Sequence, residues 1–230
     1  MSVMREVVRL EELDRELFAA MKSYLECYSS HLPVRRITVV GNAPLAPSEE
    51  RRDVIDGSDL VFRCNSLVLD EPGGPPVLGT KTDVVVAARA TRITPWFFRD
   101  YTRRAYLIID AGNLRKPEPP LTPEPWPEDL GAWPISNRVF GIPLKHLISP
   151  EKQGRGAVPT TGTEAAYVAH ELFPEAELFL TGYSFIHDRE QTRWEHHWGD
   201  TSSVHRAHKI DREGELLQSW IDDGSAHFLP

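Results

Sequence analysis

The chain has 230 residues, of which 40% are hydrophobic and 26% are charged. This composition is ordinary for a soluble globular protein. The length suits a single α/β domain over residues 1–230, with a sizeable core. The 26 basic and 34 acidic residues give a net charge of −8, which argues against a nucleic-acid partner.

The N-terminal region lacks the signature of an exported or membrane-anchored chain. No apolar run approaches the roughly 20 residues of a spanning helix, and three charges interrupt the first ten residues, where a signal peptide needs its apolar core. Only two cysteines, Cys27 and Cys64, are present, which favours a reducing compartment. The sequence therefore predicts a cytoplasmic protein without a spanning membrane segment.

The first predicted element is an amphipathic helix over Val7 to Tyr28, where apolar residues recur every three or four positions. The charges between them are mixed in sign and not basic, which disfavours a membrane-surface role. We expect residues 1–33 to form an N-terminal helix packed on the domain.

Two short apolar runs that follow are each closed by an asparagine. Ile37 to Val40 stops at Gly41-Asn42, and the run inside Asp59 to Asn65 ends on polar residues. Both read as buried strands. Ligands of open α/β sheets bind at the carboxyl ends of the strands, so Asn42 and Asn65 are candidate binding residues.

Further strands are predicted at Thr82 to Ala88 and Arg104 to Asp110, with a nearly helical stretch at Pro95 to Tyr101 between them. Seven prolines within Asn113 to Pro134 predict an irregular surface loop. Its two tryptophans, Trp126 and Trp133, either form a platform for an acceptor sugar or hold the loop on the core.

The C-terminal part contains a capped helix and a strand. Thr163 to Leu172 is predicted to be helical, with Thr160-Thr161-Gly162 at a start whose free amides attract phosphate or carboxylate. Glu177 to Thr181 is predicted to be a strand that ends at Gly182. Tyr183 to Ala207 shows no periodicity, and Asp211 to Trp220 predicts a closing helix. The alternation of elements predicts an α/β fold with a mostly parallel, Rossmann-like sheet flanked by helices.

Four pieces of the sequence, in this order, resemble the sialyl motifs of the family 29 glycosyltransferases, which are sialyltransferases. The large motif is similar to VVGNAP (39–44), IDGSDLVFRCN (55–65) and LGTKTD (78–83), and the small motif to VPTTG (158–162) with TGY (181–183). The third motif is similar to HHWGD (196–200), and the very small motif to His208 with Glu213.

The resemblance implies a variant of the GT-A fold and an inverting, metal-independent transfer of sialic acid from CMP-sialic acid to a glycan hydroxyl. The nucleotide sugar would be a substrate, so no cofactor is expected, and the acceptor would be an oligosaccharide or glycolipid. CMP-Kdo is an alternative donor on the same scaffold. Eukaryotic relatives carry an N-terminal membrane anchor and a motif-linking disulfide, neither of which is seen here. Either the anchor has been removed from this sequence, or the protein is a cytoplasmic, microbial member, which the cysteine content favours.

The resemblance also assigns roles to single residues. His208 is implied as the general base, with Glu213 orienting its imidazole, and His205 is the rival candidate. His197 would neutralise the departing phosphate. Trp198 and Gly199 replace the more usual aromatic pair of the third motif.

The resemblance also implies donor binding by six residues of the large and small motifs, whose amides suit ribose hydroxyls and phosphate oxygens. They are Asn42, Asn65, Thr160, Thr161, Gly162 and Gly182. Arg63 and Lys81 are further candidate partners for the phosphate. Arg63 is equally well explained by an ion pair with Asp59 or Asp83, so neither is assigned to the site.

Three other interpretations of the sequence are considered. Five histidines among residues 187–208 suggest a metal site, but they lack the tight spacing of metal-binding pairs, so no metal is expected. A nicotinamide-binding oxidoreductase would need G-x-G-x-x-G where VVGNAP has one glycine. An inactive nucleotide- or glycan-binding module is the third possibility.

Overall fold

The computed structural model describes residues 2–89, 91–109 and 126–230, without the side chains of residues 2–10. Within these ranges seven strands form one sheet in the order β5-β4-β3-β2-β1-β6-β9, and every neighbouring pair is parallel. The strands are β1 (Arg36–Val40), β2 (Leu60–Cys64), β3 (Val84–Ala88), β4 (Ala105–Ile109), β5 (Trp133–Ile135), β6 (Glu177–Thr181) and β9 (His227–Phe228). The predicted α/β fold with a mostly parallel sheet is confirmed.

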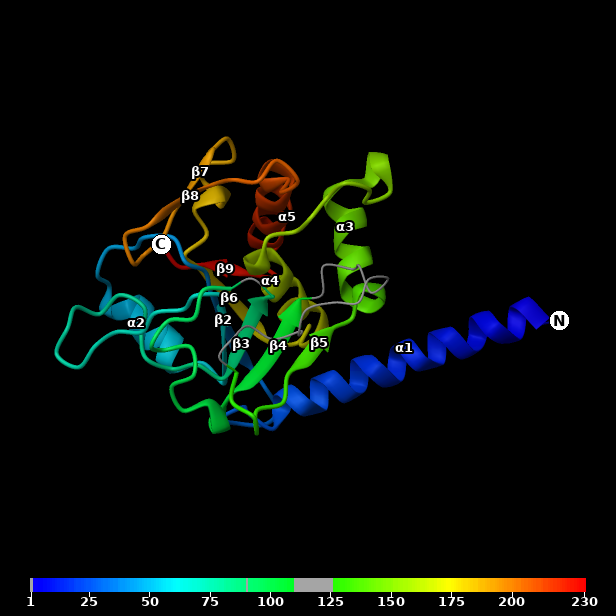
Figure 1. Ribbon diagram of the computed structural model, residues 1–230, viewed down its shortest axis with the longest axis horizontal. Helices are drawn as coiled ribbons and strands as arrows, with labels where there is room; N and C mark the ends of the chain where they lie inside the picture. The colour runs from blue at the N-terminus through cyan, green and yellow to red at the C-terminus, as the bar shows by residue number, and fades with distance from the viewer. Residues whose placement is uncertain (1, 90, 110–125) are drawn as a thin grey trace.

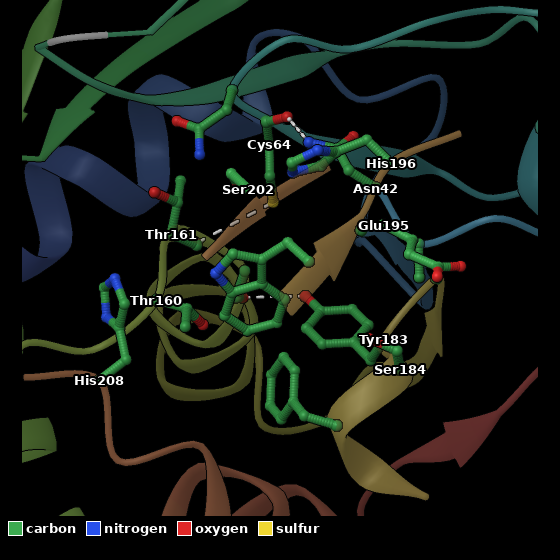
Figure 2. Close-up of a pocket in the computed structure, with 17 residues that line it drawn as sticks. Asn42, Cys64, Thr160, Thr161, Tyr183, Ser184, Glu195, His196, Ser202 and His208 are labelled. Carbon is green, nitrogen blue, oxygen red and sulfur yellow. Dashed lines mark hydrogen bonds between the residues drawn. The ribbon is translucent and has the colours of Figure 1, made fainter. Parts of the chain in front are cut away.

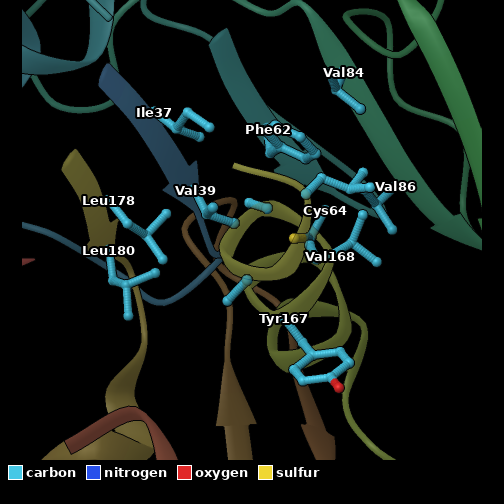
Figure 3. Packing of buried hydrophobic residues seen from close by; sticks show 14 of the residues in the cluster. Ile37, Val39, Phe62, Cys64, Val84, Val86, Tyr167, Val168, Leu178 and Leu180 are labelled. Carbon is cyan, nitrogen blue, oxygen red and sulfur yellow. The ribbon is translucent and has the colours of Figure 1, made fainter. Parts of the chain in front are cut away.

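Helices and loops cover both faces of this sheet. One face packs against α3 (Ile142–Ile148), α4 (Thr161–Leu172) and α5 (Ile210–Asp222), and the other against α2 (Glu49–Asp56) and an aromatic loop over residues 91–101. Strand residues alternate between the faces, as the strand period of two requires. Val39, Phe62 and Val86 therefore meet Val168 of α4 in the main core (Figure 3).

The N-terminal helix α1 (Ser2–Glu26) starts earlier than predicted and packs only in part. Met21 and Leu25 are buried in the main core, whereas the start of the helix runs outward from the sheet (Figure 1). Among the described helices, including α1 with its 25 residues, none is both long and apolar enough to cross a membrane.

The topology creates a switch point between β1 and β6. From β1 the chain adds β2 to β5 on one side, and β6 then pairs with the other side of β1. Just beyond the two strands the backbones touch at Gly41 and Gly182. A Cβ on Gly41 would lie 2.3 Å from the Gly182 carbonyl oxygen, and Gly182 has a φ of +72°. Both glycines are required by this close approach of the two backbones. The switch point leaves a crevice at the carboxyl ends of the strands, where such sheets bind ligands.

Two sequence predictions need correction, and one helix was not predicted. The prolines after Asn113 do not exclude regular structure, because Trp133–Ile135 pairs with β4 as an edge strand, where proline is tolerated; residues 113–125 lie outside the described residues. Tyr183 to Ala207 contains a hairpin, β7 (Arg193–Glu195) and β8 (Thr201–Ser203), too short for a periodic signal. The polar loop after Asn42 contains helix α2, capped by the Ser48 side chain.

The two tryptophans of the proline-rich segment are packing residues. Trp126 contacts the rings of Phe98 and Tyr106 and donates its indole N–H to the Leu130 carbonyl. Trp133 packs against Tyr24 of α1. Their contacts support the interpretation that they hold the segment on the core.

Candidate active site

A cavity of about 290 Å³ lies at the carboxyl ends of β1, β2 and β6, beside the start of α4 and under the β7–β8 hairpin (Figure 2). It occupies the switch point of the sheet. Its walls are formed by Gly41, Asn42, Ala43, Cys64, Asn65, Thr160, Thr161, Gly162, Gly182, Tyr183, Ser184, Phe185, Trp194, Glu195, His196, Ser202 and His208. All six residues predicted to bind the donor line this cavity, together with the predicted base His208.

The two asparagines are held by the ends of the strands. Asn42 donates its Nδ2 to the Cys64 carbonyl at 2.9 Å, which ties the end of β1 to the end of β2. Asn65 has a φ of +49°, a left-handed conformation that asparagine tolerates. Its Oδ1 accepts from the Ala88 N–H at 3.0 Å and from the Thr91 hydroxyl at 2.8 Å. The oxygen of Asn65 is thus occupied, so its amide nitrogen is the group suited to donate to a ligand.

The start of α4 forms the floor of the cavity. Thr160 is the N-cap and accepts from the Thr163 N–H, while the backbone N–H groups of Thr161 and Gly162 lie in the first turn. Amides at this position lack partners inside the helix and carry the positive end of its dipole. A Cβ on Gly162 would lie 3.0 Å from the Tyr183 ring, whose hydroxyl donates to the Gly162 carbonyl at 2.8 Å. The floor is therefore closely packed and suited to an anionic group.

Glu213 of α5 holds the start of α4 in place through hydrogen bonds. Its Oε2 accepts from the Thr160 N–H at 2.9 Å, the Thr160 hydroxyl at 2.7 Å and the Thr163 hydroxyl at 2.6 Å. The side chain is fully buried, and burial raises its pKa, while the hydrogen bonds from Thr163 and Thr160 act in the opposite direction. The hydrogen bonds of Glu213 thus go to the threonines, and the ring of His208 is oriented by another group.

That group is the carbonyl of Val158. The Nδ1 atom of His208 lies 2.6 Å from the Val158 oxygen, and because a carbonyl can only accept, Nδ1 carries the proton. The neutral ring therefore keeps Nε2 as a free proton acceptor. His205, the rival base, is exposed and is absent from the described wall of the cavity; its Nδ1 accepts from the Ala207 N–H at 3.2 Å.

The two adjacent histidines of the third motif differ in position. His196 lines the cavity, stacks on Trp198 with ring centroids 4.6 Å apart, and pairs its Nδ1 with Asp200 at 2.6 Å. His197, the residue predicted from the sequence, is not among the described cavity residues. Its backbone N–H donates to the Asn42 carbonyl at 2.9 Å, and burial lowers the pKa of its ring. The structure thus brings His196 rather than His197 to the wall.

Sequence reasoning missed the residues that the hairpin contributes. Trp194 and Glu195 of β7 and Ser202 of β8 line the cavity, and Trp194 makes edge contacts with the rings of Phe185 and His208. The only signal for them was the concentration of aromatic and histidine residues in a segment without periodicity.

The cationic residues near the motifs lie away from the cavity. Arg63 is fully buried and donates to the backbone carbonyls of Leu78 and Lys81, and burial lowers its pKa to about 10. Lys81 forms an ion pair with Asp83 at 3.5 Å. Among the described residues that line the cavity none is lysine or arginine. A bound anion would meet amide and imidazole groups there.

The histidines after residue 186 do not converge. Over the described parts of the chain, no three His, Cys, Asp or Glu side chains are grouped so that they could hold a metal ion.

Solved structures with a similar fold were found, whereas no protein-family model and no curated protein matches the sequence. A crystal structure of a mammalian sialyltransferase has a TM-score of 0.54, and one of a mammalian sialyltransferase in complex with Gal-beta-1-3GalNAc-ortho-nitrophenol has 0.52. Each is 18% identical to this chain and covers 85% of it, while the chain covers 69% of each neighbour. At this identity the similarity establishes a shared fold.

Proposed function

We propose that this protein is an inverting glycosyltransferase of the sialyltransferase type, which transfers sialic acid from CMP-sialic acid to a hydroxyl of an acceptor glycan. The observation that carries the proposal is the hydrogen bond between His208 Nδ1 and the Val158 carbonyl. The Nδ1–H of the ring is held by this bond, so Nε2 is a free base at a cavity that also contains the start of α4 and two strand-end asparagines. The shared fold with mammalian sialyltransferases supports the same assignment.

The chemistry follows from these groups. Nε2 of His208 accepts the proton of the acceptor hydroxyl as its oxygen bonds to the anomeric carbon of the donor sugar. The bond from that carbon to the phosphate oxygen breaks on the opposite face, and CMP leaves with the electron pair, which inverts the configuration. In this proposal the N–H groups of Thr161 and Gly162 and the ring of His196, all at the cavity, stabilise the charge that develops on the phosphate.

In this proposal the CMP-sugar is a substrate, no cofactor takes part, and no metal ion is needed. The phosphate meets helix amides and imidazoles in place of a cation. CMP-Kdo is the alternative donor, because both sugars carry a carboxylate beside the anomeric carbon. The acceptor is proposed to be an oligosaccharide or a glycolipid.

The test combines ligand binding with a transfer assay. CMP is expected to raise the melting temperature, and UDP and NAD are expected to have less effect. Release of CMP from CMP-sialic acid with a glycan acceptor should continue in EDTA. Stabilisation by NAD without CMP would support an oxidoreductase, and CMP binding without turnover of either CMP-sialic acid or CMP-Kdo would support a binding module. Activity that is lost on chelation and restored by Mn²⁺ or Mg²⁺ would contradict the metal-free mechanism.

A further inference from the structure

A second cavity, of about 490 Å³, adjoins the first. The two share Ala43, Gly182, Tyr183, Ser184 and Glu195 as walls, so they are continuous at the ends of β1 and β6. The first cavity alone is at the lower end of the range for ligand sites, roughly 300–1000 Å³. A nucleotide sugar and its acceptor need more room than it offers.

The orientation of the CMP-sugar along the two cavities follows from the proposed function, on which this inference rests. His208 and Thr160 lie on one side of the first cavity, and Ser184 and Glu195 lie on the opposite side, where the second cavity begins (Figure 2). The anomeric carbon must face the base His208, and the phosphate lies at the start of α4. Since the nucleoside is attached to the far side of the phosphate, it extends toward Ser184 and the second cavity.

The walls of the second cavity combine aromatic and polar groups. His187 and Phe228 are perpendicular, with ring centroids 4.8 Å apart, and offer an aromatic surface for a flat ring. Gln191 also lines this cavity, and its Nε2 is shielded from solvent without a hydrogen-bond partner among the described residues. Such an unpaired buried donor is unusual in native structures. Asp188 adds an exposed carboxylate.

We propose that the second cavity binds the cytosine base of the donor nucleotide, and that Gln191 and Asp188 determine its specificity. The base stacks on the aromatic surface, and the Gln191 amide pairs with the N3 acceptor and the O2 or N4 group beside it. The Asp188 carboxylate accepts from the exocyclic N4 amino group, as carboxylates do with cytosine. Uracil carries a carbonyl oxygen at that position, which a carboxylate repels.

Isothermal titration calorimetry with CMP, UMP and ribose 5-phosphate tests this assignment. The wild-type protein should bind CMP at least about tenfold more tightly than UMP, which corresponds to the loss of one good hydrogen bond. Asp188→Asn should bring the two affinities close together. Gln191→Leu should weaken CMP binding by about tenfold or more and leave ribose 5-phosphate binding unchanged.

The matched control is Glu190→Gln. Glu190 is an exposed acidic residue of the same segment outside the described wall of the cavity, and only its backbone N–H contacts Asp188, at 3.3 Å. This variant should bind all three ligands like the wild type. Asp188 is exposed as well, so its substitution tests the site without disturbing the core.

The outcomes separate this inference from the proposed function. A wild-type protein that binds no CMP would contradict both. CMP binding that is unaffected in Asp188→Asn and Gln191→Leu would overturn the base pocket and leave the proposed function standing. Variants that raise only the KM of the acceptor would show that the second cavity holds the acceptor, which also overturns the inference.

Discussion

Glu213 in the first turn of α5 accepts two hydrogen bonds from Thr160, the N-cap of α4, one from its backbone N–H at 2.9 Å and one from its hydroxyl at 2.7 Å. The carboxylate thereby joins the two helices at the edge of the cavity. It also sets where the amides of Thr161 and Gly162 lie, since these follow the N-cap directly.

Removing this carboxylate should strongly lower the stability of the folded protein. Glu213→Ala leaves the buried N–H of Thr160 without its acceptor and creates a void, so we expect the free energy of unfolding to fall by roughly 2–4 kcal/mol in urea denaturation. Glu215→Ala is the control, because Glu215 is on the same helix in an exposed ion pair with Arg212 and should cost less than about 1 kcal/mol. Equal losses of unfolding free energy in the two variants would show that Glu213 does not hold the start of α4.

Substitution of His208 should separate catalysis from binding. His208→Ala should lower kcat by roughly 100-fold or more, as loss of a general base does, while calorimetry shows CMP affinity close to wild type. His205→Ala should change little. An inactive His205→Ala together with a fully active His208→Ala would show that His205, and not His208, is the base.

The phosphate partner should be identified by comparing the adjacent histidines. His196 lines the cavity, and His197 is the residue that the motif resemblance selected. We expect His196→Ala to reduce both CMP affinity and kcat by about tenfold or more, because the proposed contact exists in the bound state and the transition state. His197→Ala should have the smaller effect on affinity. The reverse order, measured by calorimetry and initial rates, would restore the role to His197.

The amide nitrogen of Asn65 should contribute to donor affinity. Asn65→Asp keeps an oxygen for the Ala88 N–H and the Thr91 hydroxyl, and aspartate also tolerates the left-handed backbone, but the N–H donors are lost. CMP binding should weaken by roughly 1–3 kcal/mol in calorimetry. Asn65→Ala should show a similar loss of affinity, together with lower stability. An unchanged affinity in folded Asn65→Asp would remove this residue from the site.

Glu164 should make folding stability depend on pH. Burial raises the pKa of this α4 carboxyl to about 7, with Lys145 of α3 acting against the shift and Glu213 of α5 adding to it. Because the folded pKa is above the unfolded one, the stabilising contribution is complete below about pH 4.3 and is lost as the pH rises through about 7. Glu164→Gln should therefore be more stable than wild type at pH 8 by roughly 2–3 kcal/mol, and similar at pH 5. A stability difference that does not change with pH would contradict this assignment.

The sequence alone predicted five of the seven strands of the described sheet and the six proposed donor-binding residues that line the cavity. The runs that became β1, β2 and β6 are short, β-branched and buried, so their pattern marks strands whatever the rest of the chain does. Asn42 and Asn65 follow the ends of β1 and β2, and Thr160 is the N-cap of α4. Because parallel strands share one carboxyl edge, position in the chain was enough to place them around one crevice.

Only the tertiary structure decided which side chains of the last segment enter the cavity. His196 and His197 lie in the turn that joins β7 and β8, where no regular period fixes which of two neighbouring side chains faces the cavity. That choice is fixed by the hydrogen bond from the His197 N–H to Asn42, and the orientation of His208 by Val158, 50 residues earlier. Trp194 likewise reaches the cavity through a hairpin of three-residue strands. Such contacts join distant parts of the chain and leave no local pattern, because their energy appears only when the fold has brought both partners together.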